Sequence, residues 1–135
     1  MKEYPYNEVK ALKHLSDWIT VEQYGKDSFV YKKQPPGEED LTIAQRALER
    51  AREVVASGEY DVVVLDEICV AVYFGLFKQE EITQLLKDKP EKVELVLTGR
   101  YCPDEWLELA DLVTEMHEVK HYYQQGIISR KGFES

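Results

Sequence analysis

The amino-acid sequence predicts an α/β fold in which a mostly parallel sheet is flanked by helices. Helix-like and strand-like segments alternate along the chain, which is the order found in parallel sheets with right-handed crossovers. The run Tyr60–Leu65 is almost continuously apolar, as expected for a strand that helices cover on both faces. The length of 135 residues is enough for one domain, spanning 1–135, and not comfortably for two.

The N-terminal part of the chain predicts a helix, a strand and a loop. Apolar residues recur every three positions in 4–15, which is typical of a short amphipathic helix. The segment 18–24 is rich in β-branched and aromatic residues and predicts a strand that ends at Gly25. The sequence Gln34-Pro-Pro-Gly37 interrupts both regular structures, so 26–39 is expected to be a surface loop.

The next elements are a long helix and a buried strand. Asp40 is the expected N-cap of the helix, and Thr42-Ile-Ala-Gln45 has the form of a capping box. A single apolar stripe follows, and Ser57-Gly58 is a typical helix end. The strand 60–65 comes next, and the segment 68–77 fits either a short helix or a turn.

The C-terminal half continues the alternation. A helix is expected at 78–89 and a strand at 93–98. Pro103 suits the first turn of a further helix, and 111–116 predicts a last strand. The remaining tail, 117–135, is polar, aromatic and basic.

Composition narrows the classes of function. The net charge of −9 argues against a general binder of nucleic acid or of membrane surfaces, which needs a positive field. No apolar run approaches the roughly 20 residues of a membrane span, and no secretory leader opens the sequence. The two cysteines, Cys69 and Cys102, have no CxxC spacing, so a disulfide framework or a zinc site is not expected. A cytoplasmic location is therefore predicted.

The strongest candidate site follows the strand 62–65, where Asp66 and Glu67 stand. Ligands of parallel sheets bind beyond the carboxyl ends of the strands. A carboxylate delivered there suits Mg²⁺, which prefers oxygen ligands and keeps several waters. The same pattern also fits a buried strand that leads into a solvated acidic turn.

A second candidate is Thr98-Gly-Arg100, directly after the strand at 93–98. Glycine allows close backbone approach, and arginine can bind a carboxylate or phosphate through two parallel hydrogen bonds. The alternative is a simple turn that carries a surface arginine.

Two further segments are candidates. The tail gathers Lys120, His121, Arg130 and Lys131 in an otherwise acidic chain, either as a local basic pocket or as a solvated terminus. The three histidines lack an HExxH spacing, which argues against zinc. In the loop, Phe29-Val-Tyr31 offers either an apolar wall for a planar ligand or two rings that anchor the loop to the core.

Taken in order, these segments resemble the ATP:corrinoid adenosyltransferases that are built on a P-loop fold. The resemblance covers nearly the whole chain. Its strongest stretches are Tyr60-Asp-Val-Val-Val-Leu-Asp-Glu67, Val96-Leu-Thr-Gly-Arg100, Glu108-Leu-Ala-Asp-Leu-Val-Thr-Glu115, and Val119-Lys-His121 with Gly126-Ile127 and Lys131-Gly132.

The resemblance implies an activity and its substrates. The family transfers the 5′-deoxyadenosyl group of ATP to cobalt(I) of a corrinoid and releases triphosphate. Since cobalt(I) is itself the nucleophile, no nucleophilic side chain is needed, and the protein contributes placement and charge control.

The resemblance also implies roles for individual residues. Glu67 is the expected Mg²⁺ ligand, with Asp66 orienting it, and three residues are expected near the nucleotide. Phe29 and Tyr31 match an aromatic pair that lies under the corrin ring and displaces the lower axial ligand of cobalt(II), which makes reduction easier. Tyr31 stands where the family usually has tryptophan. The residues expected near the nucleotide are Arg100, Lys120 and His121.

One departure from the family is large. The implied fold is P-loop NTPase-like (RecA-like), yet the first strand, the P-loop, the first helix and the second strand have no counterpart here. No GxxxxGK[ST] sequence occurs in the 135 residues, and Met1-Lys2 looks like an internal methionine used as a start. The triphosphate then lacks its backbone cradle and lysine, so weak or absent transferase activity is expected of these residues alone.

The departure also affects assembly. The missing first strand would lie beside the strand 61–65, so an uncovered sheet edge and a homo-oligomer are expected. Two alternatives remain open: a non-catalytic corrinoid-binding or regulatory homologue, and a fragment that pairs with a separate P-loop segment.

Overall fold

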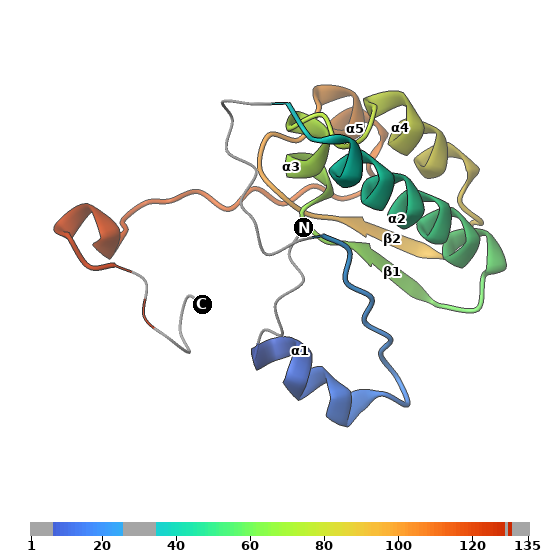
Figure 1. The fold of residues 1–135 in the computed structure, drawn as a ribbon, viewed down its shortest axis with the longest axis horizontal. Coiled ribbons are helices and arrows are strands. Elements are labelled where there is room, and N and C mark those ends of the chain that lie inside the picture. Colours follow the sequence, from blue (N-terminus) through green and yellow to red (C-terminus); the bar gives the residue numbers. More distant parts are fainter. Residues whose placement is uncertain (1–6, 26–34, 129, 131–135) are drawn as a thin grey trace. The chain divides into compact units, whose positions relative to one another are not determined.

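The computed structural model describes residues 7–25, 35–128 and 130, which fall into two compact units (Figure 1). The described part of the larger unit comprises 23–25 and 35–110. That of the smaller unit comprises 7–22, 111–128 and 130. Each unit has its own secondary-structure elements.

The larger unit is an α/β arrangement around a parallel pair of strands. The strands pair in register from Val62 opposite Glu94 to Leu65 opposite Leu97. The α/β class and the parallel pairing predicted from the sequence are therefore confirmed. The segment 68–77, which fitted either a helix or a turn, contains a short helix at Ile68–Tyr73. In chain order the elements are α2 (Glu38–Ser57), β1 (Val62–Leu65), α3 (Ile68–Tyr73), α4 (Gln79–Asp88), β2 (Glu94–Leu97) and α5 (Asp104–Leu109).

Helix α2 begins before the cap that the sequence predicts. Gly37 is the N-cap, and its backbone N–H donates to the Asp40 carboxylate at 3.2 Å. Asp40 thus lies inside the first turn, and the Thr42 hydroxyl donates back to the Glu38 carbonyl at 2.9 Å. The prediction of Asp40 as N-cap and of a capping box at Thr42–Gln45 was wrong. Gly37 is the last residue with extended backbone, and the helix begins at Glu38. The predicted end was correct, since Gly58 takes the left-handed conformation at φ 61°.

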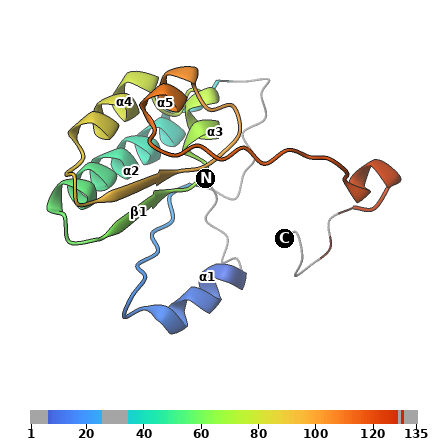
Figure 2. The ribbon, with the colours of Figure 1, turned by 180° about the vertical axis from the view of Figure 1, so that it is seen from behind.

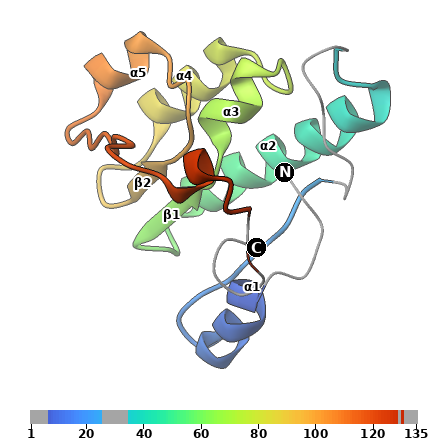
Figure 3. The same ribbon diagram turned by 90° about the vertical axis from the view of Figure 1, so that its left-hand side faces the viewer.

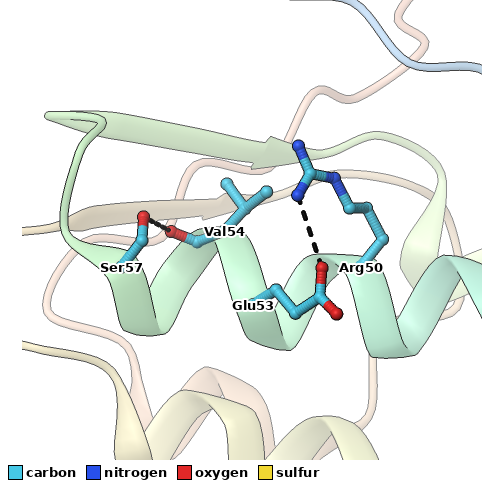
Figure 4. Close-up of polar contacts among 4 residues, drawn as sticks. All are labelled: Arg50, Glu53, Val54 and Ser57. Atoms are coloured by element: carbon cyan, nitrogen blue, oxygen red, sulfur yellow. Dashed lines mark hydrogen bonds and ion pairs between the residues drawn. The ribbon is translucent and has the colours of Figure 1, made fainter.

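Figure 4 shows two local contacts on the polar side of α2. The Ser57 hydroxyl donates to the Val54 carbonyl at 2.8 Å, and Arg50 pairs with Glu53 at 3.4 Å one turn earlier. Exposed ion pairs of this kind contribute little to stability. The helix is held instead by its opposite face, which buries Ala44, Leu48 and Val55.

The core of the larger unit lies between the helices and one face of the sheet. One cluster joins α2, α3, α4 and α5, and a second joins α2 and α4 to the strands. Trp106 of α5 is buried in the first cluster, and its indole N–H donates to the Thr83 hydroxyl at 2.9 Å. Burial of these side chains fixes both strands against the helices.

The two faces of the sheet differ. Figures 1 and 2 show α2 to α5 on one side of β1 and β2, and Figure 3 shows the same layers from another direction. Val63 faces the helices and is buried, whereas Val62, Val64 and Val96 are 54%, 55% and 37% exposed. The expectation that the strand at 60–65 is buried on both faces was wrong, because the helices of this unit cover one face only.

The smaller unit contains α1 (Asn7–Leu12), a 3₁₀ turn at Lys13–Leu15 and a second one, η2, at Tyr122–Gln125. The helix predicted near the N-terminus is confirmed over its described residues. The strands predicted at 18–24 and 111–116 were wrong. Neither segment belongs to a strand, and β1 and β2 form the only sheet among the described residues. Within 7–25, 35–128 and 130, no helix combines the length and apolar character that crossing a bilayer requires.

Candidate functional site at the carboxyl ends of the strands

The carboxyl ends of β1 and β2 meet at one edge of the sheet because the strands are parallel. Asp66 and Glu67 follow β1, and the segment Thr98-Gly-Arg100 follows β2. The Thr98 backbone N–H donates to the Leu65 carbonyl at 3.3 Å, which extends the pairing by one residue beyond β2. The structure therefore brings together two of the segments that the sequence analysis singled out.

The Thr98 side chain links the two strand ends. Its hydroxyl donates to Asp66 Oδ1 at 2.7 Å and accepts the Glu67 backbone N–H at 2.8 Å. One hydroxyl thus orients the Asp66 carboxylate and fixes the start of the turn at Glu67. Sequence reasoning gave Thr98 no role of its own. The available signal was its place directly after a strand that neighbours the acidic pair.

Glu67 adopts a left-handed backbone conformation, with φ 59° and ψ 22°. Left-handed residues other than glycine cost free energy and gather at functional sites. The turn lets α3 begin at once: the Ala71 N–H donates to the Glu67 carbonyl at 3.0 Å, and the Cys69 N–H donates to the Thr98 carbonyl at 3.2 Å. The Glu67 side chain remains exposed, and its carboxylate has no hydrogen bond to another described residue.

Gly99 packs tightly against the start of α3. Its φ is +124°, and an added Cβ would lie 3.2 Å from Cys69 Cβ and 3.2 Å from the Val70 nitrogen. A side chain would therefore push the segment after β2 away from α3. Gly99 thus allows the close backbone approach that the sequence predicts, and the neighbouring element is α3.

Arg100 and Tyr101 complete the second strand end. Tyr101 is left-handed at φ 64°, and its ring stacks on Tyr73 of α3 with the centroids 4.2 Å apart and the planes at 23°. The Arg100 guanidinium lies 5.7 Å from the centroid of the Tyr101 ring. Arg100 is exposed and makes no hydrogen bond or ion pair with the described part of the chain.

Two free thiols lie near this strand end: Cys69 in α3 is buried, and Cys102 in the segment after β2 is half-buried. Burial raises the pKa of the Cys69 thiol to about 12, and a hydrogen bond with the Cys102 side chain adds to the rise. Cys69 therefore stays protonated near neutral pH. Among the described residues, no group of three or more histidine, cysteine, aspartate or glutamate side chains could hold a metal.

Asp66 and Glu67 nevertheless fit one kind of cation. Both are exposed carboxylates, and Thr98 holds one oxygen of Asp66. Mg²⁺ takes one or two protein carboxylates and completes its shell with water and substrate phosphates. The all-oxygen donor set suits Mg²⁺ and does not suit a zinc site, which is built from histidine and cysteine.

The geometry of the larger unit does not test the remaining predicted residues. Phe29 and Tyr31 fall outside the described residues. Lys120 and His121 belong to the smaller unit and are exposed. His121 Nδ1 accepts the Tyr123 backbone N–H at 3.0 Å, so this nitrogen caps η2. The segment 111–116, predicted as a last strand before the basic tail, forms no strand and so provides no strand end there. A role for Lys120 or His121 beside Arg100 stays a prediction.

Fold and site together define an α/β protein with an acidic pair and an arginine at the carboxyl edge of parallel strands. The family model for ATP:corrinoid adenosyltransferase BtuR/CobO/CobP matches residues 1–135, and the chain belongs to this family. The family assignment made from the sequence is thereby confirmed.

Curated relatives agree with the family match. The chain is 34% identical over 123 residues to a corrinoid adenosyltransferase of Sinorhizobium sp, a match that covers 90% of this chain and 56% of the relative. It is 32% identical over 97 residues to the corrinoid adenosyltransferase of Escherichia coli K12, covering 72% of this chain and 50% of the relative. Corrinoid adenosyltransferase CobA of Salmonella typhimurium LT2 is 30% identical over 97 residues, covering 72% of this chain and 50% of the relative. The chain thus spans about half the length of these relatives.

Proposed function

We propose that this chain takes part in transferring the 5′-deoxyadenosyl group of ATP to cobalt(I) of a corrinoid, cob(I)alamin or cob(I)inamide, in adenosylcobalamin biosynthesis. The observation that carries the proposal is the Thr98 bridge between the strand ends. It holds the acidic pair Asp66 and Glu67 beside the segment that bears Arg100. We assign this activity to the cytoplasm, where free thiols such as Cys69 and Cys102 persist.

In this proposal Glu67 and Asp66 hold Mg²⁺, which offsets the negative charge of the triphosphate. Glu67 is the direct ligand because its carboxylate is exposed and has no hydrogen bond to the described residues. Asp66 is the orienting partner because Thr98 holds one of its oxygens at 2.7 Å. Without the cation the pair would repel the triphosphate, so the acidic side of the site depends on Mg²⁺.

Arg100 supplies the positive side of the proposed site. Its guanidinium presents N–H donors in a fixed fork that matches two phosphate oxygens. As cobalt(I) attacks C5′, the bond to the triphosphate breaks and negative charge grows on the leaving oxygen. A guanidinium placed there stabilises that charge. Lys120 and His121 are proposed to add to the nucleotide site, and Phe29 and Tyr31 to contact the corrinoid.

The experiment that tests the proposal follows adenosylcobalamin formation from reduced cobalamin, ATP and Mg²⁺ by the loss of the cobalt(I) spectrum. Because the 135 residues contain no GxxxxGK[ST] sequence, we expect slow transfer from this polypeptide alone. A polypeptide carrying the part of the Sinorhizobium relative that the match does not cover should accelerate it. A normal enzymatic rate without this addition would contradict the proposed impairment.

A separate experiment addresses assembly. We propose that the exposed sheet face at Val62, Val64 and Val96 favours association, either with further copies of the chain or with a P-loop segment. Analytical ultracentrifugation should find oligomers that Val64→Glu dissociates, while Leu41→Glu on exposed α2 surface serves as the control. A monomer at all concentrations would exclude association between copies.

A second candidate function is corrinoid binding without transfer. The absence of a GxxxxGK[ST] sequence from these 135 residues is the observation that favours it. Titration with cobalamin in the absence of ATP distinguishes the candidates. A change in the visible spectrum that Tyr31→Ala abolishes, without any transfer in the supplemented assay, would support the binding protein over the transferase.

A further inference from the structure

The Arg100 side chain lies beside an aromatic stack that ties the segment after β2 to helix α3. Tyr73 is the last residue of α3, and its ring stacks on Tyr101 at 4.2 Å. Phe74 packs edge-on against the Tyr73 ring, with the centroids 5.5 Å apart and the planes at 73°. Arg100 lies over the Tyr101 ring at 5.7 Å, within the range of a cation–π contact. Two stacked rings, Tyr73 and Tyr101, therefore connect α3 to the Arg100 guanidinium.

Burial alone does not explain a tyrosine at position 101. Tyr101 is 54% exposed and Tyr73 is 43% exposed, so the stacked pair lies at the surface. The Tyr101 backbone has φ 64°, an angle that glycine or asparagine adopts at lower cost. The tyrosine thus adds a ring at a position where the backbone favours other residues. Strained residues of this kind are typical of functional sites.

The ring holds Arg100 without using its hydrogen-bond donors. In a cation–π contact the ring attracts the positive charge, while the guanidinium N–H groups are not consumed. Arg100 makes no hydrogen bond or ion pair within the described part of the chain. The side chain is therefore restricted in direction and yet ready to donate to a ligand.

We propose that Tyr101, supported by Tyr73, is a positioning residue that sets the Arg100 guanidinium toward the polyphosphate of the nucleotide. This inference rests on the proposed function in so far as Arg100 contacts the nucleotide. The orientation of Arg100 itself is a property of this chain and can be measured without any ligand.

The first test is ligand-free. Nitrogen-15 relaxation of the Arg100 Nε–H group in the full 135-residue chain should report a restricted side chain. Tyr101→Asn keeps the left-handed backbone and removes the ring, so it should make this group as mobile as that of the exposed Arg52 on α2. Tyr101→Phe keeps the ring and should keep the restriction. Equal mobility of Arg100 Nε–H in the wild type and in Tyr101→Asn would overturn the proposal.

The second test uses MgATP and inorganic triphosphate as probes, with dissociation constants measured by NMR titration. Tyr101→Asn should weaken both by about two- to fivefold, as expected for an exposed cation–π contact, and Tyr101→Phe should restore affinity. In an Arg100→Ala background the Tyr101→Asn change should have no further effect. A loss of the same size in that background would overturn the positioning role, since it would show that the ring acts without Arg100.

The two tests separate the inference from the proposed function. If Arg100→Ala leaves the affinity for MgATP unchanged, the nucleotide role of Arg100 is wrong, and the relaxation measurement still decides whether Tyr101 orients it. Tyr73→Ala provides a second variant that leaves the strained position untouched. It should increase the mobility of Arg100 Nε–H, and Tyr73→Phe should not.

Discussion

The ends of β1 and β2 lie side by side and are built in opposite ways. The end of β1 is acidic, with Asp66 and Glu67, whereas the end of β2 carries Arg100. Each contains a left-handed residue other than glycine, Glu67 at φ 59° and Tyr101 at φ 64°. The acidic end is fixed by two hydrogen bonds of the Thr98 hydroxyl, one donated and one accepted. The basic end is fixed by the stacking of Tyr101 on Tyr73.

This difference has a physical consequence. Hydrogen bonds depend on distance and direction, so the acidic end requires the Thr98 hydroxyl at its present place. Stacking depends on a flat surface, so the basic end tolerates any aromatic ring at 73 or 101. Both ends share one constraint, the close packing of Gly99 against α3. Substitutions can separate these three contributions.

The largest effect is expected at the shared constraint. Gly99→Ala forces an alanine into φ +124° and places its Cβ 3.2 Å from Cys69 Cβ and from the Val70 nitrogen. Backbone strain alone costs about 1–3 kcal/mol, and the contacts add to it. Urea unfolding should therefore show a clear loss of stability. Gly75→Ala is the matched control, because φ is +77° there and no atom lies within 4 Å of the added Cβ. Equal losses would show that the packing against α3 is unimportant.

Thr98→Val should have the next largest effect. The change keeps the shape of the side chain and removes one acceptor and one donor, leaving the Glu67 N–H without its partner. The expected loss is about 1–2 kcal/mol in the free energy of unfolding. Thr42→Val removes a single hydroxyl bond on the exposed side of α2 and should cost less. If the two variants were equally stable, the strand ends would not depend on the Thr98 bridge.

The two free cysteines, Cys69 and Cys102, should differ in reactivity. Cys69 is buried with its pKa raised to about 12, whereas Cys102 is half-buried. Since the thiolate is the reactive form, iodoacetamide at pH 8 should modify Cys102 first and Cys69 only after unfolding. Peptide mass spectrometry measures both rates. Equal rates in the folded chain would contradict the protected state of Cys69.

The same pKa gives a small dependence of stability on pH. A thiol whose pKa is raised in the folded state binds its proton more tightly there than in the unfolded chain. The contribution of the Cys69 thiol to the free energy of unfolding is complete below the ordinary thiol pKa of about 8.5. It is lost as the pH rises toward about 12. The free energy of unfolding should thus fall less steeply above pH 9 in Cys69→Ala than in the wild type. Parallel pH profiles would remove Cys69 as a source of this dependence.

Local patterns in the sequence predicted the larger unit well. The apolar run at β1 and the stripe of α2 identify these elements because burial dictates them residue by residue. The segments 18–24 and 111–116 also have strand-like composition, yet neither forms a strand. Whether such a segment becomes a strand depends on contacts with residues far away in the sequence, and composition does not contain that information.

The candidate site shows the same limit. Asp66, Glu67 and Arg100 were predicted because ligands bind at the ends of parallel strands. The roles of Thr98 and Tyr101 depend on contacts with residues about thirty positions earlier, Asp66 and Tyr73, and no local pattern reveals such contacts. The left-handed turn at Glu67 likewise involves a distant residue, because the Glu67 N–H donates to the Thr98 hydroxyl.

The most direct test of the central claim is the Mg²⁺ dependence of ATP binding, measured by titration of the full chain with and without the cation. If Asp66 and Glu67 hold Mg²⁺ against the triphosphate, Mg²⁺ should tighten ATP binding, and Glu67→Gln should remove that gain. Glu91→Gln, in the exposed turn before β2, should retain it. ATP binding that ignores Mg²⁺ in the wild type, or a gain that survives in Glu67→Gln, would contradict the account.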